Sequence, residues 1–197
     1  GIIKVNNRFV AEGTETPMIP RVGLRMQLSE TLTNLTYYGR GPEENYRDRR
    51  TSQFIGEYTT PIKDLYEPYI RPQENEHRTD IYWCALTNKQ KGGLLFIADR
   101  TFELNASNYP LGSLDSGETI DNGAPRTANT NHRHLTDPQP EKMVDMFIDY
   151  RMMGVGGDNS WGAMAHEPYL IRPGVENAIE YGFSLSLIHI SEPTRPY

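Results

Sequence analysis

The sequence predicts an all-β protein built as an antiparallel β-sandwich. Six segments rich in β-branched, aromatic and aliphatic residues have the length of strands, and none shows the periodicity of a multi-turn helix. Most of the 17 glycines and 14 prolines fall between these segments, where they favour turns. Short strands separated by frequent turns are typical of a sandwich.

The predicted strands follow one another along the chain. In residues 21–28 apolar side chains alternate with polar or small ones, the period of two that indicates a half-buried strand. The remaining predicted strands are residues 32–38, 81–86, 94–98, 142–152 and 178–185. Residues 111–139 are polar and weakly periodic, which predicts extended loops.

Composition narrows the class of protein. The 197 residues, 37% hydrophobic and 23% charged, fit a domain that buries a core. A net charge of −6, with Lys and Arg scattered among acids, opposes binding to nucleic acid or to an anionic membrane. No apolar run approaches the ~18 residues of a membrane helix, and no secretory signal precedes the first strand, so the compartment stays open between cytoplasm and periplasm. The single cysteine, Cys84, excludes an internal disulfide, and we expect it to be buried in a strand.

Several polar clusters have a structural interpretation beside a functional one. Adjacent residues on a strand point to opposite faces, so Glu43 and Glu44 are poorly placed as the facing carboxylates of a glycosidase, and we expect loop or cap acids. His132 and His134 would share one face of a strand, but no third metal ligand can be named, which favours structural histidines. The glycines of residues 154–157 lack the Lys-Ser/Thr ending of a phosphate-binding loop.

Trp161 follows Gly156, Gly157, Asp158 and Asn159, a context that predicts a tight turn presenting an indole. The apolar face of a sugar ring can stack on such a ring. On the residues alone, a packing role for this tryptophan is equally open.

Six motifs are distinctive: residues 20–24 (PRVGL), 39–46 (GRGPEENY) followed by Asp48 and Arg49, 66–69 (YEPY), 72–75 (PQEN), 132–135 (HRHL) and 153–161 (MGVGGDNSW). In this order they resemble the carboxy-terminal domain of the large bacterial β-galactosidases of glycoside hydrolase family two. The resemblance implies a large antiparallel sandwich similar to the galactose-mutarotase fold. Residues 1–184 would form part of that sandwich, beside a catalytic TIM barrel. The chain enters mid-pattern without an initiator methionine, so we expect an N-terminal truncation.

The reaction implied by the resemblance is retaining hydrolysis of terminal β-D-galactosyl residues in lactose-type substrates, by two glutamates about 5–5.5 Å apart. Those glutamates and the family's magnesium and sodium sites belong to the barrel, so we expect no catalytic or metal residue here. The expected partners are the β-galactoside, the barrel portion of the same enzyme and further copies in a homo-oligomer.

One functional residue transfers from the family. Trp161 matches the tryptophan that stacks on the aglycone sugar at the mouth of the active site. Gly156 and Gly157 are then expected to let the backbone turn, and Asp158 or Asn159 to brace the loop through side-chain hydrogen bonds to the backbone.

Two alternatives remain beside this interpretation. A stand-alone mutarotase-like epimerase could use His132 or His134 with a glutamate. A non-catalytic module could serve carbohydrate binding or assembly, with Trp161 as its sugar contact.

Residues 185–197 depart from the family pattern. They resemble the translation of an adapter used in sequencing libraries. We expect a non-native tail that is disordered or packed without specificity.

Overall fold

The computed structural model describes residues 1–11, 18–114, 120–121, 124–125, 136–159, 161–172 and 178–189. The strands are β1 (Ile2–Phe9), β2 (Arg21–Ser29), β3 (Asn34–Gly41), β4 (Phe54–Pro61), β5 (Arg78–Thr87), β6 (Gly92–Ser107), β7 (Ile120–Asp121), β8 (Ala124–Pro125), β9 (Met143–Met152) and β10 (Ile179–His189). Three 3-10 helices, η1 (Ile62–Asp64), η2 (Leu111–Leu114) and η3 (Glu167–Tyr169), lie between them. None of the helices in these ranges is long and apolar enough to cross a membrane.

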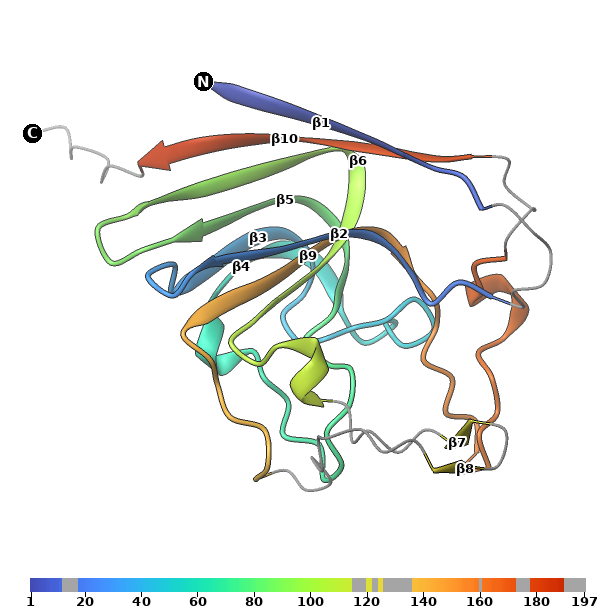
Figure 1. The fold of residues 1–197 in the computed structure, drawn as a ribbon. Helices are drawn as coiled ribbons and strands as arrows, with labels where there is room; N and C mark the ends of the chain where they lie inside the picture. Colours follow the sequence, from blue (N-terminus) through green and yellow to red (C-terminus); the bar gives the residue numbers. More distant parts are fainter. Residues whose placement is uncertain are drawn as a thin grey trace, which may run out of the picture.

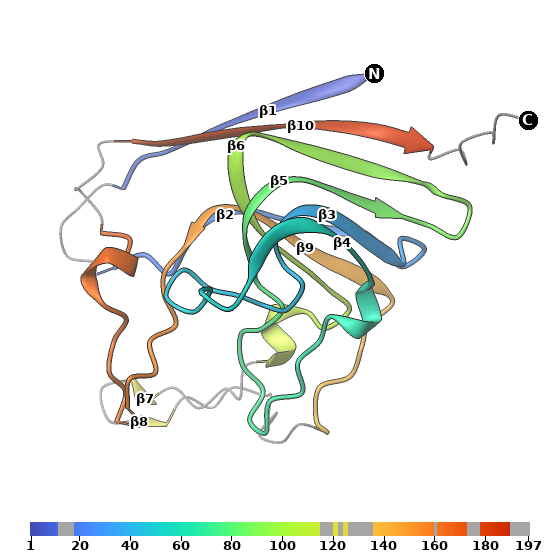
Figure 2. The ribbon, with the colours of Figure 1, turned by 180° about the vertical axis from the view of Figure 1, so that it is seen from behind.

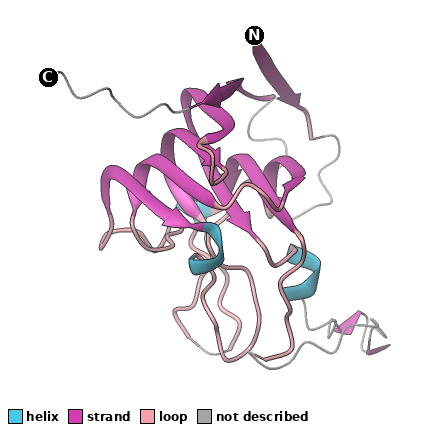
Figure 3. Cartoon of the chain, turned by 90° about the vertical axis from the view of Figure 1, so that its left-hand side faces the viewer, coloured by secondary structure: helices cyan, strands magenta, loops and turns pink. Residues whose placement is uncertain are grey.

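One antiparallel sheet of eight strands makes up the body of the protein (Figure 1). The order is β1-β10-β6-β5-β3-β4, while β9 pairs with β6 and β2 pairs with β9. In both ribbon views β1 and β10 run side by side along one end of the sheet (Figure 2). From the side, the strands gather at one end of the molecule and most loops at the other (Figure 3). The all-β antiparallel prediction is confirmed, as part of a sandwich and not as a closed barrel.

Strand β6 is the place where the sheet divides. Residues 92–98 at its start pair with β10, whereas residues 103–107 at its end pair along the same edge with β9. Its pairing with β5 shifts register over the same stretch. The pairs β1–β10 and β2–β9 therefore form two branches that separate at β6.

The main core lies between these branches and the rest of the sheet. Phe96 of β6 and Phe183 of β10 share one cluster with Met146 and Ile148 of β9, and Tyr37 of β3 joins them. All five are almost completely buried. Apolar residues of β2 pack against the same cluster, so the two branches enclose it as the layers of a sandwich do.

Two edge strands of the sheet, β1 and β4, leave apolar side chains exposed. On β1, Ile2 and Ile3 are 70% and 62% exposed, and on β4 Phe54 is 72% exposed. β1 and β4 also end the path of the sheet, so their outer backbone groups have no strand partner within the described residues. Open edges of this kind favour pairing with additional chain.

The six predicted strands are confirmed, with corrections to their length. Residues 21–28 form the half-buried strand β2, and Cys84 is buried in β5. The prediction of residues 94–98 was too short because β6 continues to Ser107. β1 and β4 were not predicted as strands. Residues 111–139 were predicted to form extended loops, and the structure does not describe the side chains of residues 115–135 in this range. His132 and His134 therefore lie outside the described residues.

The last described residues continue β10. Leu187 and His189 lie opposite Leu94 and Gly92 of β6, so the backbone pairing extends to His189. Pairing of this kind uses main-chain groups that every residue supplies, and Leu187 itself is 81% exposed. The non-native origin of residues 185–197 stays a prediction, and residues 190–197 lie outside the description.

Candidate functional site

The segment that follows β9 carries Trp161, whose side chain is 92% exposed. We call residues 153–159 and 161–163 the Trp161 loop. Figures 1 and 2 show the chain leaving the strands after β9 and returning at η3. At the base of the loop, Met153 N donates to Pro20 O at 2.9 Å and Gly154 N to Tyr169 O at 2.8 Å.

One carboxylate holds the start of the loop. Asp48 lies in the turn after the 39–46 motif, and its two oxygens accept hydrogen bonds from the Val155 and Gly156 amides at 3.1 and 2.8 Å. Gly154 permits this approach, because a Cβ there would lie 2.5 Å from Asp48 Oδ2 and 2.9 Å from Tyr169 Cβ. Hydrogen bonds to an ionised acceptor are stronger than neutral ones.

The tip of the loop turns on glycines. Gly156, Gly157 and Gly162 have φ of +68°, +102° and +80°, a backbone region that favours glycine. Asn159 Oδ1 accepts hydrogen bonds from the Trp161 amide at 2.9 Å and the Ala163 amide at 3.4 Å. The backbone that carries the indole is therefore fixed while the indole itself projects into solvent.

A surface pair joins the tip to the descending part of the loop. Asp158 Oδ2 accepts a hydrogen bond from His166 Nε2. This bond, together with the charge of the carboxylate, raises the pKa of His166. The four predicted loop residues thus play different parts. Gly156 and Gly157 adopt the turn conformation. The Asn159 side chain accepts hydrogen bonds from the backbone, and the Asp158 side chain accepts one from another side chain.

The turn that supplies Asp48 is itself built on Glu44. Its carboxylate accepts hydrogen bonds from Arg49, from the Tyr69 hydroxyl and, at 2.8 Å, from the Glu76 amide. Glu43, by contrast, is exposed. The expectation that both are loop acids is confirmed, since neither lies in a helix or strand.

Beneath these loops lies a layer of buried polar side chains that the sequence analysis missed. His77 is fully buried, with Nδ1 2.8 Å from Asn105 Oδ1 and Nε2 3.0 Å from Glu103 Oε2. Asn105 Oδ1 also accepts from Arg21. Both ring nitrogens of His77 therefore face acceptors, which suits the imidazolium. Burial lowers the pKa of His77, but the hydrogen bond and charge of Glu103 outweigh it and raise the pKa overall.

Arg21 connects this layer to the loop that contains Glu74 and Asn75. Its guanidinium lies 3.1 Å from Glu74 Oε1 and 2.9 Å from Asp149 Oδ2. Asn105 donates to Glu74 and to the Asn75 carbonyl. These contacts fix the loop through buried polar groups. Arg78 donates to the Glu76 and Pro42 carbonyls.

These buried groups cannot serve an exposed substrate. His77 and Glu103 form a histidine–glutamate pair of the type that an epimerase requires, yet they are 0% and 6% exposed. Across the described ranges, no three or more His, Cys, Asp or Glu side chains are grouped so as to hold a metal ion. Trp161, by contrast, is exposed on its loop.

Comparison with known proteins assigns the family. The sequence model described as "Beta galactosidase small chain" matches residues 1–185. The β-galactosidase of Priestia megaterium is 33% identical over 171 residues, which is 87% of this chain and 15% of the relative. Identity is 34% over 157 residues to the enzyme of Lactobacillus delbrueckii subsp. bulgaricus, covering 80% of this chain and 14% of that relative. It is 30% over 188 residues to that of Pseudoalteromonas haloplanktis, covering 95% and 15%. The chain belongs to the β-galactosidase small-chain family.

Proposed function

We propose that this chain is part of a β-galactosidase that hydrolyses terminal β-D-galactosyl residues with retention, and that it supplies Trp161 to the aglycone side of the active site. The observation that carries the proposal is the exposed indole on a loop fixed by Asp48 and Asn159. The chain spans about 15% of the length of the relatives it matches. The remaining length is where a catalytic barrel would lie.

The geometry of the loop suits a sugar platform. An aromatic ring stacks on the apolar face of a pyranose and contributes on the order of 0.5–1.5 kcal/mol beyond area burial. A loop already held by hydrogen bonds loses little entropy when the sugar binds. An indole that is 92% exposed contributes almost nothing to packing within the described fold, so a role outside that fold explains it better.

Retaining hydrolysis needs two carboxyl groups about 5–5.5 Å apart beside the scissile bond. The acids of the 39–46 motif do not offer them, because Glu44 is committed to Arg49, Tyr69 and the Glu76 amide. We therefore assign both catalytic glutamates, and the magnesium and sodium ions, to the rest of the enzyme. The chain alone is expected to be inactive, and the complete enzyme to act as a homo-oligomer.

A chimera tests the proposal. Residues 1–184 replace the matching segment of the Priestia megaterium β-galactosidase, and hydrolysis of lactose and of a nitrophenyl β-galactoside is measured. The chimera is expected to be active and the chain alone inactive. Trp161→Ala should lower kcat/KM for lactose by about 2- to 13-fold, the range that 0.5–1.5 kcal/mol gives. Trp161→Phe, which keeps a ring, should recover part of the loss.

The matched control is Phe54→Ala, which removes another exposed aromatic side chain from β4. It should leave lactose hydrolysis unchanged. Equal loss in Phe54→Ala and Trp161→Ala, or hydrolysis by the chain alone, would show that the proposed division of roles is wrong.

A further inference from the structure

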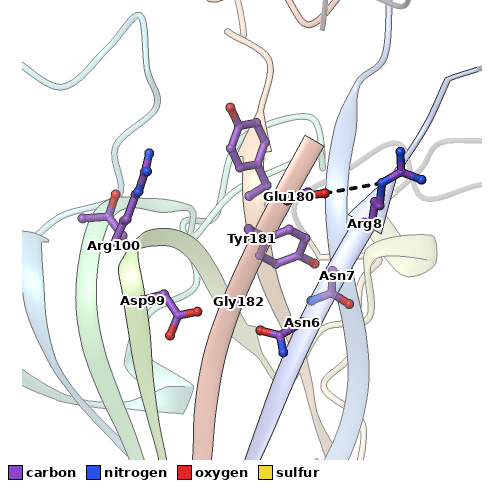
Figure 4. Close-up of a pocket in the computed structure, with 10 residues that line it drawn as sticks. Asn6, Asn7, Arg8, Asp99, Arg100, Glu180, Tyr181 and Gly182 are labelled. Atoms are coloured by element: carbon purple, nitrogen blue, oxygen red, sulfur yellow. Dashed lines mark ion pairs between the residues drawn. The ribbon is translucent and has the colours of Figure 1, made fainter. Parts of the chain in front are cut away.

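A cavity opens where the two branches of the sheet separate (Figure 4). β10 pairs with β6 as far as Ala98, and β9 pairs with it from Glu103 onward, so residues 99–101 pair with neither branch. The cavity has a volume of about 540 Å³. This falls within the ~300–1,000 Å³ typical of small-molecule sites. None of its lining residues belongs to the Trp161 loop.

Two side chains converge over a glycine on one wall. A Cβ added to Gly182 would lie 2.4 Å from Asp99 Oδ2 and 2.9 Å from Asn6 Oδ1. Figure 4 shows Asp99 and Asn6 on either side of Gly182. Neither side chain makes a hydrogen bond or ion pair to another described residue. Their oxygens are thus available to accept from a hydroxyl group.

A donor lines the same cavity. Arg100 lies on the opposite side of the cavity from Asn6, and its guanidinium is not engaged by any other described residue. The polar groups of the lining therefore include a cationic donor as well as the acceptors of Asn6 and Asp99.

Aromatic rings complete the lining. Tyr150 of β9 and Tyr181 of β10 have ring centroids 6.2 Å apart. The Tyr181 hydroxyl donates to the Ile148 carbonyl at 3.4 Å, which fixes its ring between the branches. Rings held in this way offer an apolar surface beside the polar groups.

The charges of the lining cancel. Arg8 and Glu180 form an ion pair at 3.4 Å, and Arg100 is balanced by Asp99. An anion would meet the carboxylates and a cation would meet the guanidinium groups, so neither is favoured. A neutral molecule with many hydroxyl groups and an apolar face matches both the polar and the aromatic lining. We propose that this cavity is a second saccharide-binding site, separate from Trp161, that takes a neutral sugar.

Saturation-transfer NMR on the full 197-residue chain tests the site, with lactose and maltose as neutral probes and inorganic phosphate as a charged one. Saturable transfer to a disaccharide is expected. Asp99→Ala and Arg100→Ala should each weaken it by about tenfold, the lower end of the range for losing a hydrogen bond to a charged group. Both residues are exposed, so their removal leaves the core intact. The matched control Asp64→Ala removes an exposed acid outside the cavity and should have no effect.

Trp161→Ala separates this site from the proposed function. Disaccharide binding that survives Trp161→Ala but weakens in Asp99→Ala supports the cavity. Four outcomes would overturn the proposed cavity site. They are binding that is lost only in Trp161→Ala, binding that Asp64→Ala weakens equally, binding of phosphate alone, and no saturable binding by the folded chain. The readout is binding and not hydrolysis, so an inactive chimera would not decide this question.

Discussion

Removal of the Asp48 carboxylate should release the loop that carries Trp161. In Asp48→Ala the Val155 and Gly156 amides lose acceptors at 3.1 and 2.8 Å. A hydrogen bond to a charged group contributes about 1.5–3 kcal/mol. Val155 is 40% exposed, so in the variant water can accept a hydrogen bond from its amide. We therefore expect the two hydrogen bonds to Asp48 together to contribute about as much as one such bond.

A loss of about 1.5–3 kcal/mol corresponds to a roughly 10- to 150-fold larger open population. Amide hydrogen exchange measures that population directly, residue by residue. The Val155 and Gly156 amides of Asp48→Ala should exchange faster by this factor, while the amides of β5 keep their protection. Asp48→Asn keeps an acceptor without its charge and should fall between the two.

Glu43→Ala is the matched control, because Glu43 is an exposed acid in the same loop between β3 and β4. It should leave the exchange of both amides unchanged. Unaltered exchange in Asp48→Ala would refute the claim that this carboxylate fixes the loop, and faster exchange in Glu43→Ala would show that general charge, not the two hydrogen bonds, is responsible.

Three further predictions follow from burial and packing. Burial raises the pKa of Asp149 to about 7, so between pH 4 and 7 the folded state holds a proton that the unfolded state has released. The urea midpoint of unfolding should therefore fall as the pH rises from 4 to 7. If the midpoint of Asp149→Asn fell with pH just as steeply, Asp149 would not be the cause. Gly154→Ala places a methyl group against Asp48 and should cost about 1–3 kcal/mol, measured as a lower Tm, whereas Gly112→Ala enters open space; equal melting of the two would count against the steric argument. The chain should self-associate through the β1 edge, and Ile3→Lys should shift its sedimentation toward monomer; an unshifted profile would place the contact elsewhere.

Strand positions were predictable where one face of a strand is apolar. Residues 21–28 alternate cleanly, and β2 lies there with Val22 buried and Gly23 exposed. The end of β6 was missed because the polar residues 99–101 interrupt the apolar run on which the prediction of residues 94–98 was based. Beyond them Phe102, Leu104 and Ala106 face the core. The alternating polar residues Glu103 and Asn105 are also buried, at 6% exposed each, where they pair with other polar groups.

The candidate site was predictable only in part, for a related reason. The glycines before Trp161 signal a turn from the local sequence alone, since a positive φ favours glycine. The anchor of that turn is Asp48, which is 107 and 108 residues from the amides it holds. Nothing local marks such a contact. His77 was missed likewise, because its acceptors Glu103 and Asn105 lie on β6, 26 and 28 residues away.

The buried polar layer and the exposed indole are parts of one structure. Glu103 Oε2 accepts from His77 at 3.0 Å and from the Met152 amide at 2.6 Å, and Met152 is the last residue of β9. The Trp161 loop begins at the next residue, where Met153 donates to Pro20. A charged group in the interior thus fixes the direction in which the chain leaves the sheet. A purely apolar interior could stabilise the same strands, but it would offer the end of β9 no acceptor, and the exit of the loop would be less well defined.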